Sequence, residues 1–244
     1  DYKTKTLRPF SPEYVFLAKS PVAFNSAAEN PIIEMPDGVM WDVESWMDEI
    51  SDDPEIVDLL WRVIGAVMRP HVSWNMSAWF YAESGRNGKG TILRLMRNMT
   101  HSVSLSLANL GSRFGAAPLL GASVPSAILT DENPVGSFVD AGDTVKALIT
   151  GDEVSVERKG RDAVSLRWRG FMVQCLNDLP RVRDRSPSFL RRLLFVPFDK
   201  SFTGVERTYI KEDYLGRQEV LEYVLKRVLL DMDPYYELPI PAAS

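Results

Sequence analysis

The sequence contains very few of the residues that build metal centres and disulfide frameworks. Among 244 residues there is one cysteine, Cys175, and there are two histidines, His71 and His101. An intrachain disulfide is therefore excluded, as is a zinc site built from several cysteines, and a structural metal centre is not expected. The lone cysteine fits a protein of a reducing, intracellular compartment.

Long apolar runs are also missing. No stretch approaches the roughly 18 consecutive apolar residues that a membrane-spanning helix requires, and the start, DYKTKTLRPF, lacks the apolar core of a signal peptide. We therefore expect a soluble protein with no membrane partner. Its composition, 45% hydrophobic and 25% charged, is that of a globular protein of one or two domains. Because it begins without methionine, we expect a segment of a longer polypeptide.

The charge is distributed unevenly along the chain. The formal net charge of −5 argues by itself against a nucleic-acid-binding protein. Between Val154 and Arg192, however, ten basic residues stand against four acidic ones. Such a segment is either a solvated face or one wall of a channel for a polyanion on an otherwise acidic body.

Apolar periodicity predicts an α/β fold. Three short apolar runs have the length of strands: SAWFYAES at 77–84, SAILT at 126–130 and FMVQCL at 171–176. Helical spacing follows the first run at 89–99 and precedes it at 54–68, where Asp53 can cap the helix and Pro54 suits its first turn. Apolar pairs predict a last helix at 218–232. Strands that alternate with helices favour a parallel sheet covered on both faces.

The basic stretch before the third run has a different pattern. VSVER and AVSLRW flank KGRD, which is typical of a β-hairpin with a basic tip formed by Lys159 and Arg161. From the residues alone, this tip is either a binding element or a solvated turn. Trp168, on the same hairpin, is expected in the core rather than as a stacking platform.

The most informative motif lies between the first predicted strand and the helix after it. Its residues are Gly85, Arg86, Asn87, Gly88, Lys89, Gly90 and Thr91. Glycines expose successive backbone N–H groups, a helix N-terminus adds its dipole, and the lysine reaches the β and γ oxygens of a nucleotide. We therefore predict a P-loop that binds ATP. The alternative is a glycine-rich turn with an exposed lysine.

This loop departs from G-x-x-x-x-G-K-S/T at two positions. Glu83 stands where the first glycine belongs, and Gly90 follows the lysine, so the hydroxyl is displaced to Thr91. We expect Thr91 to contact phosphate and to contribute to the magnesium site, with water and acidic residues holding more of the ion.

Acidic and amide side chains follow the other two predicted strands. Asp131 is expected to hold Mg²⁺, and Glu132 to polarise the attacking water as a general base. Asn177, after the third strand, is expected to orient that water or to sense the γ-phosphate. Each of these residues, taken alone, is also a turn former.

Together these motifs resemble the superfamily 3 helicases, in particular the phage and plasmid primase-helicases. GRNGKGT is similar to the first motif of that family, ILTDEN to the second and QCLNDLP to the third, with KALITGDEVSVERKGRDAV as the additional motif between the last two. The resemblance implies an AAA+-like P-loop ATPase core with a central parallel sheet over 71–200. A helical or collar region over 1–70 would precede it, and a C-terminal helix and tail over 201–244 would follow.

The resemblance also implies roles for cations outside the P-loop. Lys159 matches the hairpin lysine that contacts the phosphate backbone of single-stranded DNA, with Arg161 as a second contact. Arg192 matches an arginine finger that reaches the nucleotide of the neighbouring subunit, and Arg191 competes for this assignment. Lys146 matches a basic residue that acts across the same interface and contacts the nucleotide.

The function implied by the resemblance is ATP-dependent unwinding of DNA in phage or plasmid replication. The protein would use ATP and Mg²⁺, form a homo-oligomeric, hexameric ring around single-stranded DNA, and work in the cytoplasm, that of the host cell if a phage encodes it. A primase or polymerase module would lie on the same full-length chain. Two alternatives remain: a P-loop nucleotide kinase, because GKGT also occurs in such kinases, and a ring-forming replication scaffold with weak ATPase activity.

Overall fold

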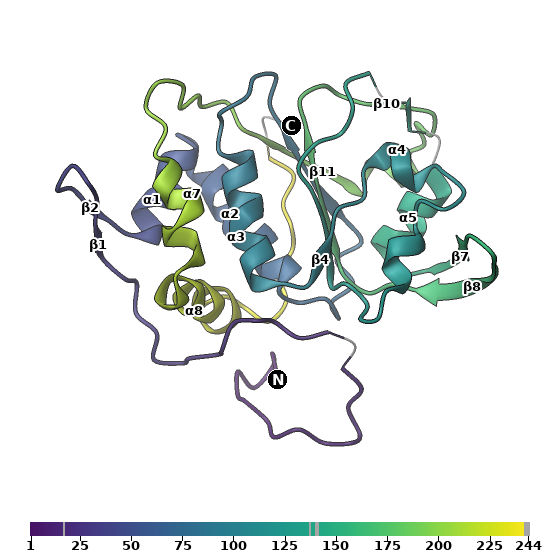
Figure 1. Ribbon diagram of the computed structural model, residues 1–244, viewed down its shortest axis with the longest axis horizontal. Helices are drawn as coiled ribbons and strands as arrows, with labels where there is room; N and C mark the ends of the chain where they lie inside the picture. The colour runs from purple at the N-terminus through teal and green to yellow at the C-terminus, as the bar shows by residue number, and fades with distance from the viewer. Residues whose placement is uncertain (17, 137, 140–141, 242–244) are drawn as a thin grey trace.

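A five-stranded parallel sheet forms the centre of the molecule (Figure 1). The computed structural model describes residues 1–16, 18–136, 138–139 and 142–241. The strands of the sheet are β11 (Leu193–Pro197), β3 (Ser77–Tyr81), β9 (Phe171–Leu176), β5 (Ala127–Thr130) and β4 (Ser102–Val103), in that order, and every neighbouring pair is parallel. The predicted α/β fold with a central parallel sheet is confirmed.

Two hydrophobic clusters lie on opposite faces of this sheet. Successive strand residues point to opposite faces, so Ala78 and Phe80 of β3 are buried in one cluster and Trp79 in the other. One face is covered by α1 (Val43–Ile50), α2 (Pro54–Val67), α3 (Lys89–Met99), α7 (Thr208–Glu212) and α8 (Gln218–Lys226). The other is covered by α4 (Leu107–Leu110), η1 (Ala117–Leu120), α5 (Gly142–Thr150) and α6 (Pro187–Leu190).

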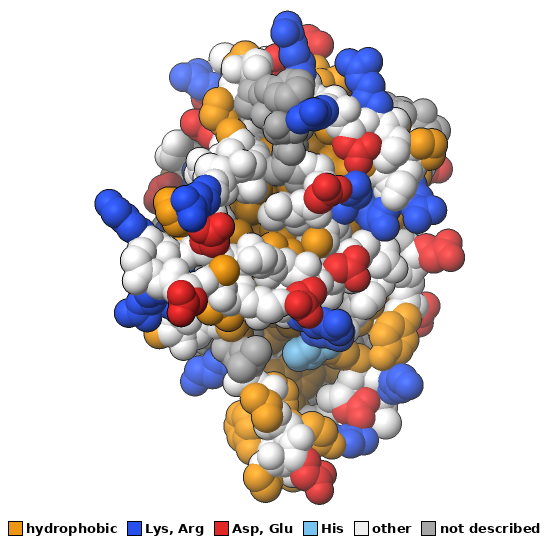
Figure 2. Space-filling view, turned by 90° about the vertical axis from the view of Figure 1, so that its right-hand side faces the viewer, with side chains coloured by type: hydrophobic (Ala, Val, Ile, Leu, Met, Phe, Trp, Pro, Cys, Tyr) orange, Lys and Arg blue, Asp and Glu red, His pale blue; other side chains and the backbone are white. Residues whose placement is uncertain are grey.

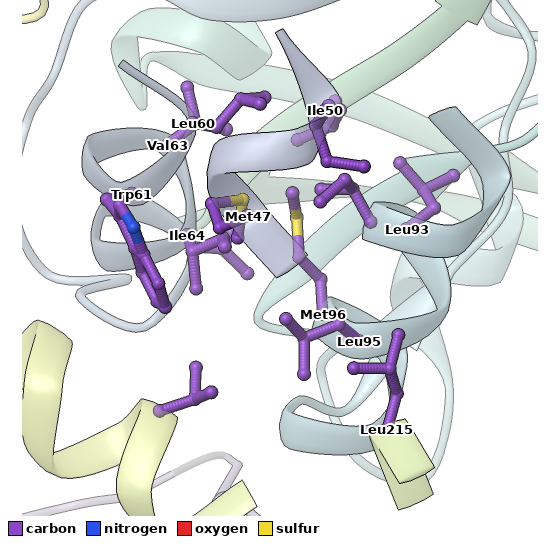
Figure 3. Close-up of a cluster of buried hydrophobic side chains, with 14 of the residues drawn as sticks. Met47, Ile50, Leu60, Trp61, Val63, Ile64, Leu93, Leu95, Met96 and Leu215 are labelled. Carbon is purple, nitrogen blue, oxygen red and sulfur yellow. The ribbon is translucent and has the colours of Figure 1, made fainter. Parts of the chain in front are cut away.

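The N-terminal helices belong to the larger cluster. Asp53 caps α2 by accepting a hydrogen bond from the Glu55 N–H at 2.9 Å, and Pro54 occupies the first turn, as predicted. Figure 3 shows Met47 of α1 and Ile64 of α2 beside Met96 of α3. Because the three helices share one core, α1 and α2 are packed on the sheet. The predicted division of the chain into an N-terminal region, an ATPase core and a C-terminal region, with boundaries at residues 70 and 200, stays a prediction.

Two strands of the central sheet were not predicted from the sequence. β4 has only two residues, too few to produce a recognisable alternation. β11 ends at Pro197, and proline argues against an interior strand. β11 is an edge strand paired only with β3, so the missing proline N–H is tolerated there.

Smaller elements surround the sheet. These are the antiparallel pair β1 (Ile33–Glu34) and β2 (Met40–Trp41), the parallel pair β6 (Phe138–Val139) and β10 (Arg181–Val182), and the hairpin of β7 (Glu153–Arg158) and β8 (Arg161–Arg167). The predicted last helix is α8, preceded by η2 (Tyr214–Gly216) and continued by the π-helical turn η3 (Arg227–Asp231). Within the described residues, no helix has both the length and the apolarity needed to cross a bilayer.

Candidate functional site

The predicted P-loop connects β3 to the first turn of α3, as expected. Gly88 is the N-cap of α3 and has φ +92°, a conformation that favours glycine. A β-carbon at this position would also lie 3.1 Å from the Ile50 side chain. Gly85 has open space around it, and the exposed Arg86, with φ +56°, forms an ion pair with Glu206 at 2.8 Å. The loop is therefore shaped by its backbone and leaves the helix N-terminus accessible.

Asn87 stabilises the loop from within. Its side chain is buried, donates to the Ser84 carbonyl and accepts from the backbone N–H of Lys89 at 3.3 Å. The carboxamide thus closes the loop on itself. Any contribution of Asn87 to nucleotide binding would come from its backbone.

Lys89 connects the P-loop to the third strand of the predicted site. Its side chain is only 6% exposed, and Nζ donates to the Ala82 carbonyl at 3.2 Å, to the Leu176 carbonyl at 2.8 Å and to Asn177 Oδ1 at 2.7 Å. Burial lowers the pKa of Lys89. All three ammonium protons have acceptors, so binding a phosphate requires the exchange of at least one of these bonds. The structure therefore brings together Lys89 and Asn177, which are far apart in sequence.

The two predicted acids lie at the same edge of the sheet. Thr130 of β5 is paired with Gln174 of β9, so Asp131 and Glu132 leave β5 where Asn177 leaves β9. Glu132 is exposed to solvent. Asp131 is half-exposed, and its carboxylate contacts the guanidinium of Arg97 from α3.

A buried residue that the sequence did not reveal, Asn133, positions these acids. Asn133 donates from Nδ2 to Gln174 Oε1 and to the Cys175 carbonyl, both at 3.0 Å, and accepts from the Leu107 N–H at 2.8 Å. It attaches the turn after β5 to β9. The only signal in the sequence was an asparagine before proline, which is typical of any turn.

The donors at this edge fit a magnesium ion that nucleotide phosphates share. Magnesium in such sites takes one or two protein oxygens and completes its shell with phosphate and water. Asp131 offers a half-exposed carboxylate, and Thr91 offers a hydroxyl in the first turn of α3. No group of three or more histidine, cysteine or acidic side chains within the described residues could hold a metal alone. The donor set is therefore one that an incoming nucleotide would complete.

Arg191 and Arg192 lie at the N-terminal ends of the strands, opposite the strand ends that carry the P-loop, the two acids and Asn177. The carbonyl of Arg192 accepts from the Ser77 N–H at 2.8 Å, at the start of β3. A strand of this length spans roughly 16 Å, which separates these arginines from the P-loop of the same protomer. Arg192 donates to Ser188 Oγ at 2.9 Å, and among the residues that the structure describes its buried Nε has no hydrogen-bond partner. Arg191 is exposed.

Lys146, predicted to contact a nucleotide across an interface, forms ion pairs within its own protomer. Its Nζ lies 2.9 Å from both Asp143 Oδ1 and Asp184 Oδ2. Hydrogen bonds to these two carboxylates raise the pKa of Lys146. Hydrogen bonds from Ser186 and then from Lys146 lower the pKa of Asp184 to about 2. Contact with a neighbouring nucleotide would have to compete with these carboxylates.

The predicted basic hairpin is confirmed. β7 and β8 pair antiparallel around a tip at Lys159 and Gly160, with Gly160 at φ +72°, and both Lys159 and Arg161 are exposed. Trp168 is buried and donates from Nε1 to the Pro125 carbonyl at 2.7 Å, so it belongs to the core as predicted. The hairpin therefore projects a cationic tip from a firmly packed base.

A second loop, not identified from the sequence, lies beside this tip. Arg113 and Phe114 line an open hollow of about 520 Å³ together with residues 157–162. Phe114 is 43% exposed, and Arg113 is paired with Glu157 at 2.7 Å. Figure 2 views the molecule from the side of the hairpin and shows basic side chains interspersed with acidic ones. Among the described residues in this view, the basic excess of residues 154–192 is therefore not gathered into one continuous patch.

Comparison with known proteins gives a partial family match and a similar fold. Residues 80–192, from β3 to Arg192, match a family of unknown function (DUF5906). An apo structure of the C-terminal region of NrS-1 is similar with a TM-score of 0.58 and 15% identity, over 83% of this chain and 54% of that chain. The A form of the same region gives a TM-score of 0.55 and 16% identity, over 80% and 46%.

A structure of the JCV helicase with a bound acetamide compound has a TM-score of 0.48 and 15% identity, over 75% of this chain and 54% of that chain. Its score is too low to support an argument, and the NrS-1 identities restrict that similarity to the fold. The chain spans about half the length of the solved chains that it matches. The NrS-1 comparisons thus support the α/β fold that the sequence predicted.

Proposed function

We propose that this chain is the ATPase motor of a DNA helicase that translocates on single-stranded DNA in phage or plasmid replication, with ATP hydrolysed between subunits of a hexameric ring. The observation that carries the proposal is the hydrogen bond from Lys89 to Asn177, 2.7 Å long. It joins the P-loop to the end of β9, at the sheet edge where Asp131 and Glu132 leave β5. A lysine, two acids and an amide at one edge suit phosphoryl transfer.

Within one protomer, these residues would divide the work of hydrolysis. Lys89 would transfer hydrogen bonds from carbonyl acceptors to the β and γ oxygens of ATP, aided by the N–H groups and dipole of α3. Asp131 and Thr91 would hold Mg²⁺, which neutralises charge on the phosphates. Glu132, which is exposed and forms no ion pair within the described part of the chain, would polarise the attacking water, and Asn177 would orient it.

Between protomers, an arginine would complete the site. Charge builds up on the equatorial oxygens during phosphoryl transfer, and a cation from a neighbouring subunit stabilises it. Arg192 lies at the N-terminal ends of the strands and cannot reach the P-loop of its own protomer, which supports a role in the neighbouring site. Arg191 is the competing candidate, and Lys146 would contribute after leaving Asp143 or Asp184.

The β7–β8 hairpin would bind the DNA. Lys159 and Arg161 offer charges that any phosphate backbone can satisfy, which suits binding without sequence preference. The neighbouring Phe114 is 43% exposed, with the Arg113 guanidinium 5.3 Å from its ring centroid, and would stack against a base on the side of the ring away from Arg113. Pore-facing hairpins from several protomers would then contact one strand.

ATP hydrolysis and strand displacement on tailed duplexes, with the assembly mass measured in parallel, test this function. We expect ATPase activity that single-stranded DNA stimulates, that depends on oligomer formation and that Lys89→Ala abolishes. Formation of ADP that requires AMP would instead identify a nucleotide kinase. Replication supported unchanged by Lys89→Ala would identify a scaffold.

A further inference from the structure

A lysine outside every predicted motif lies at the P-loop. Lys211, on α7, is exposed, and its Nζ would lie 3.8 Å from a β-carbon built at Gly90. Its neighbour Ile210 is buried in the same hydrophobic cluster as Ile92 and Leu93 of α3. This anchor holds the base of the Lys211 side chain beside the first turn of the P-loop helix.

Positive charge lies close to Lys211 in the first turn of α3. The N-terminus of α3 carries the positive end of the helix dipole, and Lys89 adds a further charge in the same turn. Three other lysines have acidic partners in the described ion pairs: Lys146 pairs with Asp184, Lys200 with Asp52 and Lys226 with Asp231. Among the ion pairs of the described residues, none involves Lys211. An anion bound at this turn would remove the repulsion.

The loop departs from the usual P-loop sequence at a position beside this lysine. P-loops carry a hydroxyl residue directly after the lysine, whereas this chain has Gly90. A β-carbon at Gly90 would be in ordinary van der Waals contact with Lys211 Nζ, at 3.8 Å, so the ammonium lies directly beside this turn of the helix. The departure from the motif and the extra cation therefore occur at the same point in space.

The segment before α7 is attached to the P-loop as well. The Phe202 N–H donates to the Arg86 carbonyl at 2.8 Å, and Glu206 forms an ion pair with Arg86 at 2.8 Å. Two interactions thus fix the segment that leads into α7 against the loop. The position of Lys211 is tied to the loop that would hold the nucleotide.

We propose that Lys211 is a second phosphate-binding cation of the nucleotide site in its own protomer. Lys89 holds the triphosphate from the buried side, and Lys211 contacts it from the solvent side, next to Gly90. The inference rests on the proposed function, because it needs a nucleotide at the P-loop. It adds a ligand contact that none of the sequence motifs contains.

Equilibrium binding of ATP, of adenosine and of inorganic tripolyphosphate to the full chain tests the proposal. Lys211→Ala and Lys211→Gln should weaken ATP and tripolyphosphate about tenfold or more, as expected for loss of a charge-assisted hydrogen bond, and leave adenosine unchanged. Lys211→Arg should retain most of the affinity. The matched control is Lys19→Ala, which also removes an exposed positive charge. Lys19 lies far from the P-loop, because its neighbour Ser20 donates from Oγ to the Met99 carbonyl at the C-terminal end of α3, at 2.7 Å.

The outcomes separate this inference from the proposed function. ATP affinity of Lys211→Ala equal to that of the wild type and of Lys19→Ala, alongside a large loss in Lys89→Ala, would overturn the role of Lys211 alone. Equal losses for ATP and adenosine would also overturn it, since they indicate damage to the fold. Failure of the wild type to bind ATP at all would overturn both proposals.

Discussion

The guanidinium of Arg97, on α3, contacts the carboxylate of Asp131 at the end of β5 and donates from its other nitrogen to the Leu129 carbonyl at 2.8 Å. The ion pair holds the predicted magnesium ligand in place and gives it a positive partner. It also connects the P-loop helix to the strand that carries the acids. Magnesium binding at Asp131 would therefore change an interaction of α3.

This ion pair should be detectable as a coupling in stability. Arg97→Gln and Asp131→Asn are each expected to destabilise the fold, and the double variant should lose less than the sum, with a coupling of about 0.5–1 kcal/mol for a partly exposed pair. Urea unfolding of the four proteins measures this term. Strictly additive losses would contradict the interaction.

The acid sensitivity of the chain should depend on Asp184. Its pKa is lowered from 3.8 to about 2, first by hydrogen bonds from Ser186 and then by Lys146. A carboxyl group with a lowered folded-state pKa contributes stability above its unfolded pKa and loses it as the pH falls through the folded value. Asp184→Asn should therefore lose less stability than the wild type between pH 4 and 2.

Urea midpoints across that pH range check the expectation. Ser186→Ala removes the side-chain hydrogen bond that lowers the pKa of Asp184 and keeps the backbone N–H bond at 2.8 Å, so it should reproduce part of the effect. If the urea midpoints of the wild type and Asp184→Asn fell equally between pH 4 and 2, the Asp184 carboxyl would not contribute to acid sensitivity as described.

Local patterns predicted those parts of the fold that depend on local chemistry. The helix after Asp53 and Pro54, the glycine-shaped turn at Gly88 and the hairpin tip at Gly160 all follow from residues close in sequence. The grouping of Lys89 with Asn177 was also predictable, because parallel strands bring their carboxyl ends to one edge.

Other parts depend on partners that are distant in sequence. Asn133 fits any turn until β9 supplies Gln174 as its partner, and Arg97 fits any helix surface until Asp131 lies beside it. Lys211 belongs to no motif, and its place at the P-loop comes from the packing of α7 on α3. Residues of this kind follow from the three-dimensional arrangement rather than from spacing.

Mixing two inactive variants tests whether Arg192 acts in the neighbouring site. Arg192→Ala should lower ATP hydrolysis by about 10³-fold or more while assembly persists, the range for loss of an arginine finger. Lys89→Ala should also be inactive. A mixture of the two should recover activity, because some interfaces join an intact P-loop to an intact arginine. The same mixture made with Arg191→Ala identifies which arginine is the finger. No recovery with either arginine variant would contradict an arginine acting between protomers.

The salt dependence of DNA binding tests the hairpin tip. Lys159→Ala removes one phosphate contact, so it should weaken single-stranded DNA binding to a similar degree for all sequences. The slope of log affinity against log salt should become shallower by about 0.7. Arg167→Ala provides the matched control, because Arg167 lies at the base of the same hairpin, where its Nε is 3.8 Å from Glu153 Oε2. An unchanged slope in Lys159→Ala, or an equal change in Arg167→Ala, would show that the tip does not contact the phosphate backbone.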